Sequence, residues 1–179
     1  MRAGFGGPSP VPSAPRFDLI ANRRALRPTM LLSDYLSVQQ IDLDLEGDTK
    51  EEILRALLGL LPLGDRSRDT LLRTLRRREN LGSTGIGRGI AIPHCRSLVV
   101  NRLHLAYGRR LDGVDFEAID GRPVSHFFLI VAPPLEVSGQ YLPVLGKVAQ
   151  FARDPEVPAM LESLTTPDEL LDLFEAKGI

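Results

Sequence analysis

Residues 78–95 read RENLGSTGIGRGIAIPHC, a run in which four glycines lead to a Pro-His pair. Glycine lets backbone N–H groups come close to an anion, because no Cβ atom lies in the way. The hydroxyl groups of Ser83 and Thr84 can donate hydrogen bonds to phosphate oxygens. His94 supplies a ring nitrogen whose usual pKa of about 6.5 leaves it mostly neutral near pH 7. The run therefore combines an uncharged nucleophile with donors for oxygen atoms, as a phosphohistidine intermediate requires.

Arg78 and Arg88 are two candidates for a charged, bidentate contact to the same phosphate. The glycines do not form a nucleotide-binding loop, because no Gly-Lys-Ser/Thr follows them and no long helix opens directly after the GxGxG spacing at 85–89. From spacing alone, His94 also has a simpler interpretation, as a loop histidine bonded to the backbone. Cys95 is interpreted as a small filler, because zinc sites need three or four ligands that are usually spaced about two to five residues apart.

The same run resembles the active-site signature of the fructose–mannitol and nitrogen-regulatory class of enzyme IIA, the type 2 IIA domain of the bacterial sugar phosphotransferase system. The family pattern is Arg-Glu, a short gap, Ser/Thr-Thr-Gly-Ile-Gly and then Gly-Ile-Ala-Ile-Pro-His, and residues 78–94 match it without a gap. The similarity continues through FEAIDG at 116–121, the apolar strand at 127–131 and the helix at 142–152. With the closing TPDELL, it covers nearly all of residues 30–179.

This resemblance implies a cytoplasmic domain with a mixed β-sheet flanked by helices. Members accept a phosphoryl group from the small phosphocarrier protein HPr, and the histidine of the Pro-His pair carries it on Nε2. His94 takes that position as the catalytic residue. The family's arginine near the site falls on Arg78, and its loop of small residues falls on Ser83, Thr84 and Gly85, which we expect to bind phosphate. The resemblance implies neither a metal nor an organic cofactor.

Position 141 departs from the pattern. Many members carry a second active-site histidine there, in a string like His-Leu-x-x-Leu, whereas this chain reads Tyr141-Leu142-Pro143-Val144-Leu145. A phenol can donate one hydrogen bond to a phosphate but cannot supply a cation. We therefore expect Tyr141 to bind the phosphate and the transfer to be less efficient.

Two functions follow as hypotheses. In the first, the chain is a phosphotransferase that takes a phosphoryl group from an HPr-like protein, either for sugar uptake or as a stand-alone regulator, and passes it to a IIB domain or controls a kinase or transporter. In the second, it is a non-catalytic module that retains the fold and binds a partner protein. The tyrosine at position 141 separates the two hypotheses, because it bears directly on transfer.

Composition and charge limit the alternatives. The chain has 179 residues, a formal net charge of −1 and one cysteine, which predicts no nucleic-acid partner, no disulfide and a reducing compartment. No apolar run approaches the roughly 20 residues of a membrane helix, so no membrane insertion is expected. Residues 1–29 hold five Arg and one Asp among many Gly, Pro and Ser, and we predict a disordered tail there; a basic arm that binds an anionic partner is the alternative. Residues 30–179 form one domain.

Helix and strand signals alternate along that domain, which predicts a mixed α/β fold. Two capping boxes, at Thr49 and at Thr166, each have Glu three residues later and an apolar helical stripe after them. Further helices are expected at 68–79 and 141–152, strands at 103–108 and 125–132, and a loop or strand crossing at 81–93. His104 and His126 lie in the strand segments and are expected to be structural.

Overall fold

The strand β6 (Val124–Ala132) lies at the centre of the structure, a computed structural model that describes residues 31–135 and 137–179. Every side chain of β6 except Ser125 is buried, as expected for a continuous apolar run covered on both faces. Phe127, Leu129 and Val131 face one apolar cluster, and Phe128, Ile130 and Ala132 face another. The strand therefore divides two cores. The tail predicted at residues 1–29 lies outside the described residues.

The sheet that surrounds β6 has six strands of mixed direction. Its order is β1-β5-β6-β3-β2, and β4 also pairs with β6. β5 (His104–Val114) runs antiparallel to β6, whereas β1 (Ile41–Asp42) runs parallel to β5. β2 (Gly85–Gly87) is antiparallel to β3 (Ile90–Ala91). The expected mixed sheet is confirmed.

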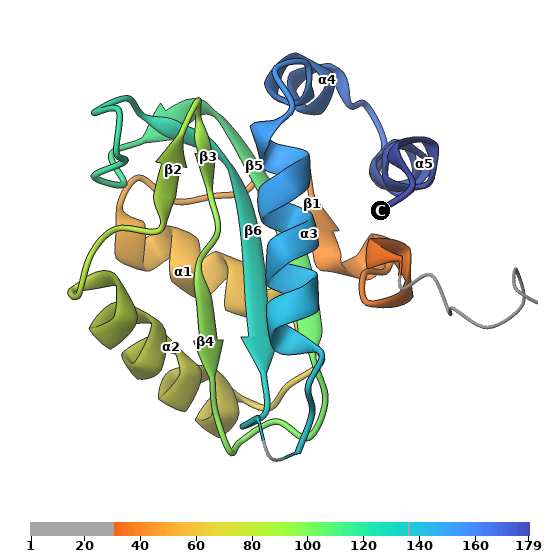
Figure 1. Cartoon of the computed structure of the whole chain (residues 1–179). Coiled ribbons are helices and arrows are strands. Elements are labelled where there is room, and N and C mark those ends of the chain that lie inside the picture. The colour runs from red at the N-terminus through yellow and green to blue at the C-terminus, as the bar shows by residue number, and fades with distance from the viewer. Residues whose placement is uncertain (1–30, 136) are drawn as a thin grey trace, which may run out of the picture.

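Helices cover both faces of this sheet (Figure 1). α1 (Lys50–Gly59) and α2 (Asp65–Glu79) pack on one face, against Phe127, Leu129 and Val131. α3 (Tyr141–Arg153), α4 (Val157–Ser163) and α5 (Pro167–Lys177) lie on the other, near the short 3-10 turns Leu32–Asp34 and Val38–Gln40. The single α/β domain expected from the alternating signals is therefore a three-layer arrangement. None of the described helices is long and apolar enough to span a bilayer.

An interruption in one strand places the Pro-His pair. β3 and β4 (His94–Arg96) both run parallel to β6, pairing with residues 126–127 and 130–132 respectively. Between them, Pro93 has no backbone N–H to donate to a ladder, although its carbonyl accepts a hydrogen bond from Ile130 N–H at 2.9 Å. His94 is thus the first residue of a strand that restarts beside the sheet's central strand.

Most of the expected element boundaries agree with the structure, but several differ. Both capping boxes are present, at Thr49 and Thr166. α2 begins at Asp65, three residues before the expected 68, and β5 extends to Val114 rather than ending at 108. Residues 81–93, expected to form a loop or a strand crossing, contain the two short strands β2 and β3, and the elements β1, β4 and α4 were not predicted.

Candidate phosphoryl-transfer site

The imidazole of His94 is oriented by a backbone carbonyl. Its Nδ1 lies 2.7 Å from the Ile92 carbonyl oxygen. A carbonyl oxygen only accepts hydrogen bonds, so Nδ1 carries the proton and Nε2 retains its lone pair. The loop bond that a structural histidine would make is therefore present, and it leaves the lone pair of the other ring nitrogen unused.

The charge state of His94 suits this role. Burial of the half-buried imidazole, together with a smaller effect of the Arg78 guanidinium, holds the pKa of His94 below its usual range. The Ile92 carbonyl and the Glu79 carboxylate act in the opposite direction. Because the lowering effects prevail, the ring is neutral at pH 7 and its lone pair is available.

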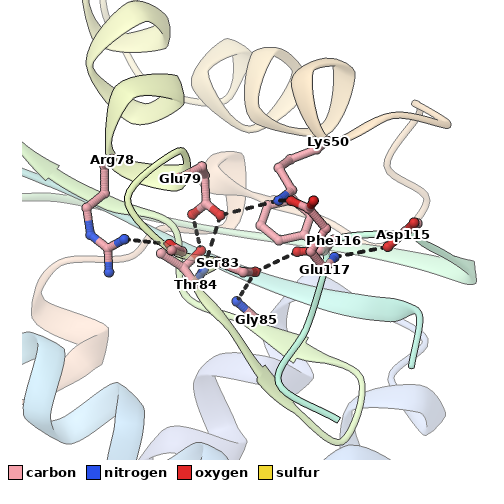
Figure 2. A network of polar contacts seen from close by, with 10 residues as sticks. Lys50, Arg78, Glu79, Ser83, Thr84, Gly85, Asp115, Phe116 and Glu117 are labelled. Carbon is pink, nitrogen blue, oxygen red and sulfur yellow. Dashed lines mark hydrogen bonds and ion pairs between the residues drawn. The ribbon is translucent and has the colours of Figure 1, made fainter. Parts of the chain in front are cut away.

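Glu79 anchors the loop before His94 (Figure 2). This carboxylate is only 6% exposed, although it ends α2. It accepts hydrogen bonds from the backbone N–H of Thr84, at 3.1 Å, and from the Thr84 hydroxyl. The ammonium group of Lys50 lies 3.7 Å away and also pairs with Glu117 at 2.6 Å. A buried carboxylate with this many partners fixes the path of the loop.

Ser83 and Gly85 are also engaged within the loop. The Ser83 hydroxyl donates to the Phe116 carbonyl at 2.5 Å and accepts from the Gly85 N–H at 3.0 Å. A Cβ on Gly85 would come within 2.8 Å of Ala118, so glycine permits this close packing. Because Thr84 is bound to Glu79, the hydroxyl and backbone donors of Ser83, Thr84 and Gly85 make their hydrogen bonds within the protein. Their assignment as phosphate ligands stays a prediction.

The two candidate arginines lie in different parts of the structure. Arg78 donates to the Gly82 carbonyl at 2.8 Å, and its charge acts on both His94 and Tyr141. Arg88 instead donates to the carbonyls of Arg153 and Asp154, at 2.8 and 3.0 Å, at the C-terminal end of α3. Tyr141 begins that helix, about 20 Å away at 1.5 Å per residue. Arg88 is therefore not the phosphate ligand, and Arg78 remains the candidate.

Tyr141 lies beside His94, and its assignment as a phosphate ligand stays a prediction. The two ring centres are 6.2 Å apart, and Tyr141 is 7% exposed. Burial raises the pKa of the phenol, so it is a neutral donor at pH 7. The guanidinium carbon of Arg96 lies 5.3 Å from the centre of the Tyr141 ring. We did not single out Arg96 from the sequence, although it stands two residues after His94 in a strand and hence on the same face.

The remaining titratable side chains nearby are inert. Cys95 is buried on the opposite face of β4, and burial raises the pKa of its thiol to about 12. His104 and His126 are 5% and 1% exposed, which agrees with the structural role expected for them. His94 is thus the one described histidine with substantial access to solvent.

This geometry is that of a neutral imidazole with one free nitrogen, next to a phenol and two guanidinium groups. Residues 34–177 match the family described as "Phosphoenolpyruvate-dependent sugar phosphotransferase system, EIIA 2". The chain belongs to this family. Type 2 EIIA domains act as phosphocarriers and are phosphotransferases in general, so the family and the role expected from the motif are confirmed at this level.

Relatives of this EIIA chain are of two kinds. It is 34% identical over 134 residues to the nitrogen regulatory protein of Pseudomonas aeruginosa, covering 71% of the chain and 83% of that protein. It is 29% identical over 147 residues to the fructose-specific EIIABC component of Bacillus subtilis, covering 81% of the chain but only 23% of that protein. The chain therefore spans about a quarter of the length of the Bacillus relative. The crystal structure of the nitrogen regulatory protein IIA-Ntr from Neisseria meningitidis has a TM-score of 0.73 and 31% identity, over 80% of this chain and 98% of that one.

Proposed function

We propose that this EIIA chain accepts a phosphoryl group from an HPr-like phosphocarrier onto Nε2 of His94. The observation that supports this most is the 2.7 Å contact between Nδ1 and the Ile92 carbonyl, because it leaves the lone pair on Nε2. The bond between phosphorus and the donor's histidine nitrogen breaks as the bond to Nε2 forms, and the donor imidazole leaves with the electron pair. Nδ1 keeps its proton throughout. The Ile92 carbonyl stabilises the positive charge that develops on the ring.

The surrounding residues position the group rather than react. Arg78 and the Tyr141 phenol meet the phosphoryl oxygens, while Ser83, Thr84 and Gly85 shape the loop that presents His94. A reaction of this kind depends on positioning and charge stabilisation, with no metal or organic cofactor required of the acceptor. The proposed location is the cytoplasm, where the resemblance places HPr-like donors. The acceptor downstream is a IIB domain or a regulated kinase or transporter, and the similarity to nitrogen regulatory proteins favours the regulator.

The direct test is incubation with phosphoenolpyruvate, enzyme I and HPr, followed by intact-mass analysis. The wild type should gain the mass of one phosphoryl group, and the gain should be lost in acid. His94→Ala should show no gain while its circular dichroism stays that of the wild type. A gain that persists in His94→Ala would show that another residue is the acceptor.

The alternative, a binding module without transfer, is favoured by one observation: position 141 offers a neutral phenol in place of an imidazole. If the site transfers, Tyr141→His should be phosphorylated about ten-fold faster than Tyr141→Phe, the effect of about one charge-assisted hydrogen bond. If the chain only binds, HPr should give no transfer to the wild type, and partner binding should not respond to His94→Asp. Equal rates for the two Tyr141 variants would place residue 141 away from the phosphate.

A further inference from the structure

Strand geometry places Arg96 on the same face as the reactive histidine. In β4, His94 and Arg96 alternate with the buried Cys95, and they pair in register with Ile130 and Ala132 of β6. Ile130 and Ala132 belong to the cluster that packs against α3. Both the imidazole and the guanidinium therefore emerge on the α3 side of the sheet, where Tyr141 begins that helix.

The contacts of Arg96 differ from those of its neighbour Arg78. Arg78 is held by the Gly82 carbonyl. Arg96 is exposed, and its recorded side-chain contact within residues 31–135 and 137–179 is the Tyr141 ring, at 5.3 Å, with no hydrogen bond or ion pair. An exposed guanidinium that makes only a cation–π contact is weakly held. Its five N–H donors are thus available to an anion that arrives beside Tyr141.

The phenol lies within the field of both arginines. The charges of Arg96 and Arg78 each lower the pKa of Tyr141, against the larger effect of burial. Since the His94 ring is 6.2 Å from the same phenol, a phosphoryl group on the imidazole enters a region with a guanidinium from α2 and another from β4. A phosphoryl group on nitrogen carries close to two negative charges, which Arg78 alone does not balance.

We propose that Arg96 binds the phosphoryl group on His94 and supplies the cation that tyrosine at position 141 cannot. This inference rests on the proposed function of His94. Arg96 donates hydrogen bonds to the phosphoryl oxygens and neither gives nor takes a proton during the transfer. Because a guanidinium stays charged at all physiological pH values, the contribution of Arg96 to the phosphorylation equilibrium does not change between pH 6 and 8. A site that relies on a second imidazole loses its charge across the same interval.

The test compares Arg96→Gln and Arg96→Lys with Arg122→Gln. Arg122 is an exposed arginine near the start of β6, at the far end from His94, so its variant removes the same charge away from the site. With phospho-HPr at a fixed ratio, we expect Arg96→Gln to reach an equilibrium constant about ten-fold lower than wild type, Arg96→Lys an intermediate value, and Arg122→Gln the wild-type value. The 31P chemical shift of the phosphohistidine should change in Arg96→Gln only.

A second variant provides a readout that loss of structure does not imitate. The double variant Arg96→Gln, Tyr141→His should recover phosphorylation relative to the wild type at pH 6 and lose that recovery at pH 8. Recovery at neither pH would argue against a missing cation. If Arg96→Gln and Arg122→Gln give the same equilibrium and the same pH profile, Arg96 does not bind the phosphoryl group, although His94 remains the acceptor.

Phosphoramidate, a small-molecule donor for histidine, separates failure of this inference from failure of the proposed function. If HPr transfers nothing but phosphoramidate labels His94, the donor assignment is wrong, and the stability of that phosphohistidine in the Arg96 variants still decides the inference. Hydrolysis about ten-fold faster in Arg96→Gln than in Arg122→Gln supports it. Failure of both donors to label the wild type overturns the function and the inference together.

Discussion

His94 and His126 are two neutral histidines on neighbouring strands that differ in their exposure to solvent. Burial lowers the pKa of both, to about 4 for His126. In both, Nδ1 has a partner: the Ile92 carbonyl for His94 and the Tyr107 hydroxyl, at 2.9 Å, for His126. The difference lies at Nε2. In His126 this atom is buried without a partner among the described residues, whereas the His94 residue is partly exposed to solvent.

The comparison shows that a lowered pKa by itself does not indicate a reactive histidine. His126 is the more strongly perturbed ring, yet it is 1% exposed and packed between β3 and β5. What distinguishes His94 is an Nδ1 proton fixed by a backbone carbonyl and a ring that solvent can reach, since His126 also has an arginine, Arg109, beside it. A site search by pKa alone would select the wrong histidine.

Chemical modification should separate the two rings by the largest margin. Diethyl pyrocarbonate acylates neutral, accessible imidazole nitrogens, so at pH 7 we expect His94 to react rapidly. His126 can react only when the sheet opens, and an opening free energy of at least about 4 kcal/mol makes its reaction at least about a thousand-fold slower. Peptide mass spectrometry over a time course measures both rates.

His104, which is 5% exposed, serves as an internal control and should follow His126. Urea should bring all three rates together as the chain unfolds. Comparable rates for His94 and His126 in the native protein would remove the contrast in accessibility on which the comparison depends.

Acid should act on the fold through His126. In the unfolded chain this ring takes up a proton near pH 6.5, whereas in the folded chain it does so only near pH 4. The free energy of unfolding should therefore fall as the pH drops from about 6.5 to about 4, by about 3 kcal/mol at about 1.4 kcal/mol for each pH unit. Urea unfolding at several pH values gives this slope.

Other groups also titrate in this interval, so the slope of a His126→Leu variant is the reference. That variant has a lower stability at pH 7, because the Tyr107 hydroxyl loses its partner, but its pH dependence should be flatter. A slope equal to that of the wild type would mean that His126 takes up its proton in the folded state as easily as in the unfolded state.

The smallest effects concern the titration of His94 itself. Removing the nearby cation with Arg78→Gln should raise the pKa of His94, and removing the carboxylate with Glu79→Gln should lower it, because these charges act in opposite directions. Two-dimensional 1H–15N spectra of the imidazole, recorded against pH, follow both changes and also report the tautomer. Shifts of the same sign in the two variants would place one of these charges elsewhere.

Much of the fold can be predicted from the sequence where local signals are strong. The SHFFLIVA run predicts the central strand, and Thr49 and Thr166 mark two helix starts with side-chain oxygens. The start of α2 is concealed because its N-cap is Gly64, which has no side chain to signal a cap. The second half of β5 contains the charged residues Arg109, Arg110 and Asp112. These residues do not give the apolar pattern of a strand, so this part of β5 depends on tertiary pairing.

The candidate site is predictable to a smaller extent. The motif resemblance predicts His94 and Tyr141 as site residues, because each lies within a short contiguous sequence motif. The hydrogen-bond partners of the loop hydroxyls cannot be predicted from the sequence, since Ser83 donates to a carbonyl 33 residues away. Glu79 lies within the quoted motif, but its burial depends on how α2 packs against the loop. The proximity of Arg96 to Tyr141 joins a strand and a helix that are distant in the chain.

The main-chain origin of the bond to His94 has an evolutionary consequence. The carbonyl at position 92 is present whatever side chain that codon specifies, so no point substitution there can delete the acceptor that fixes the proton on Nδ1. The position of the proton on the His94 ring is thus set by the course of the backbone around Pro93 rather than by a second side chain. A substitution at residue 92 or at position 141 therefore leaves the acceptor for the Nδ1 proton in place.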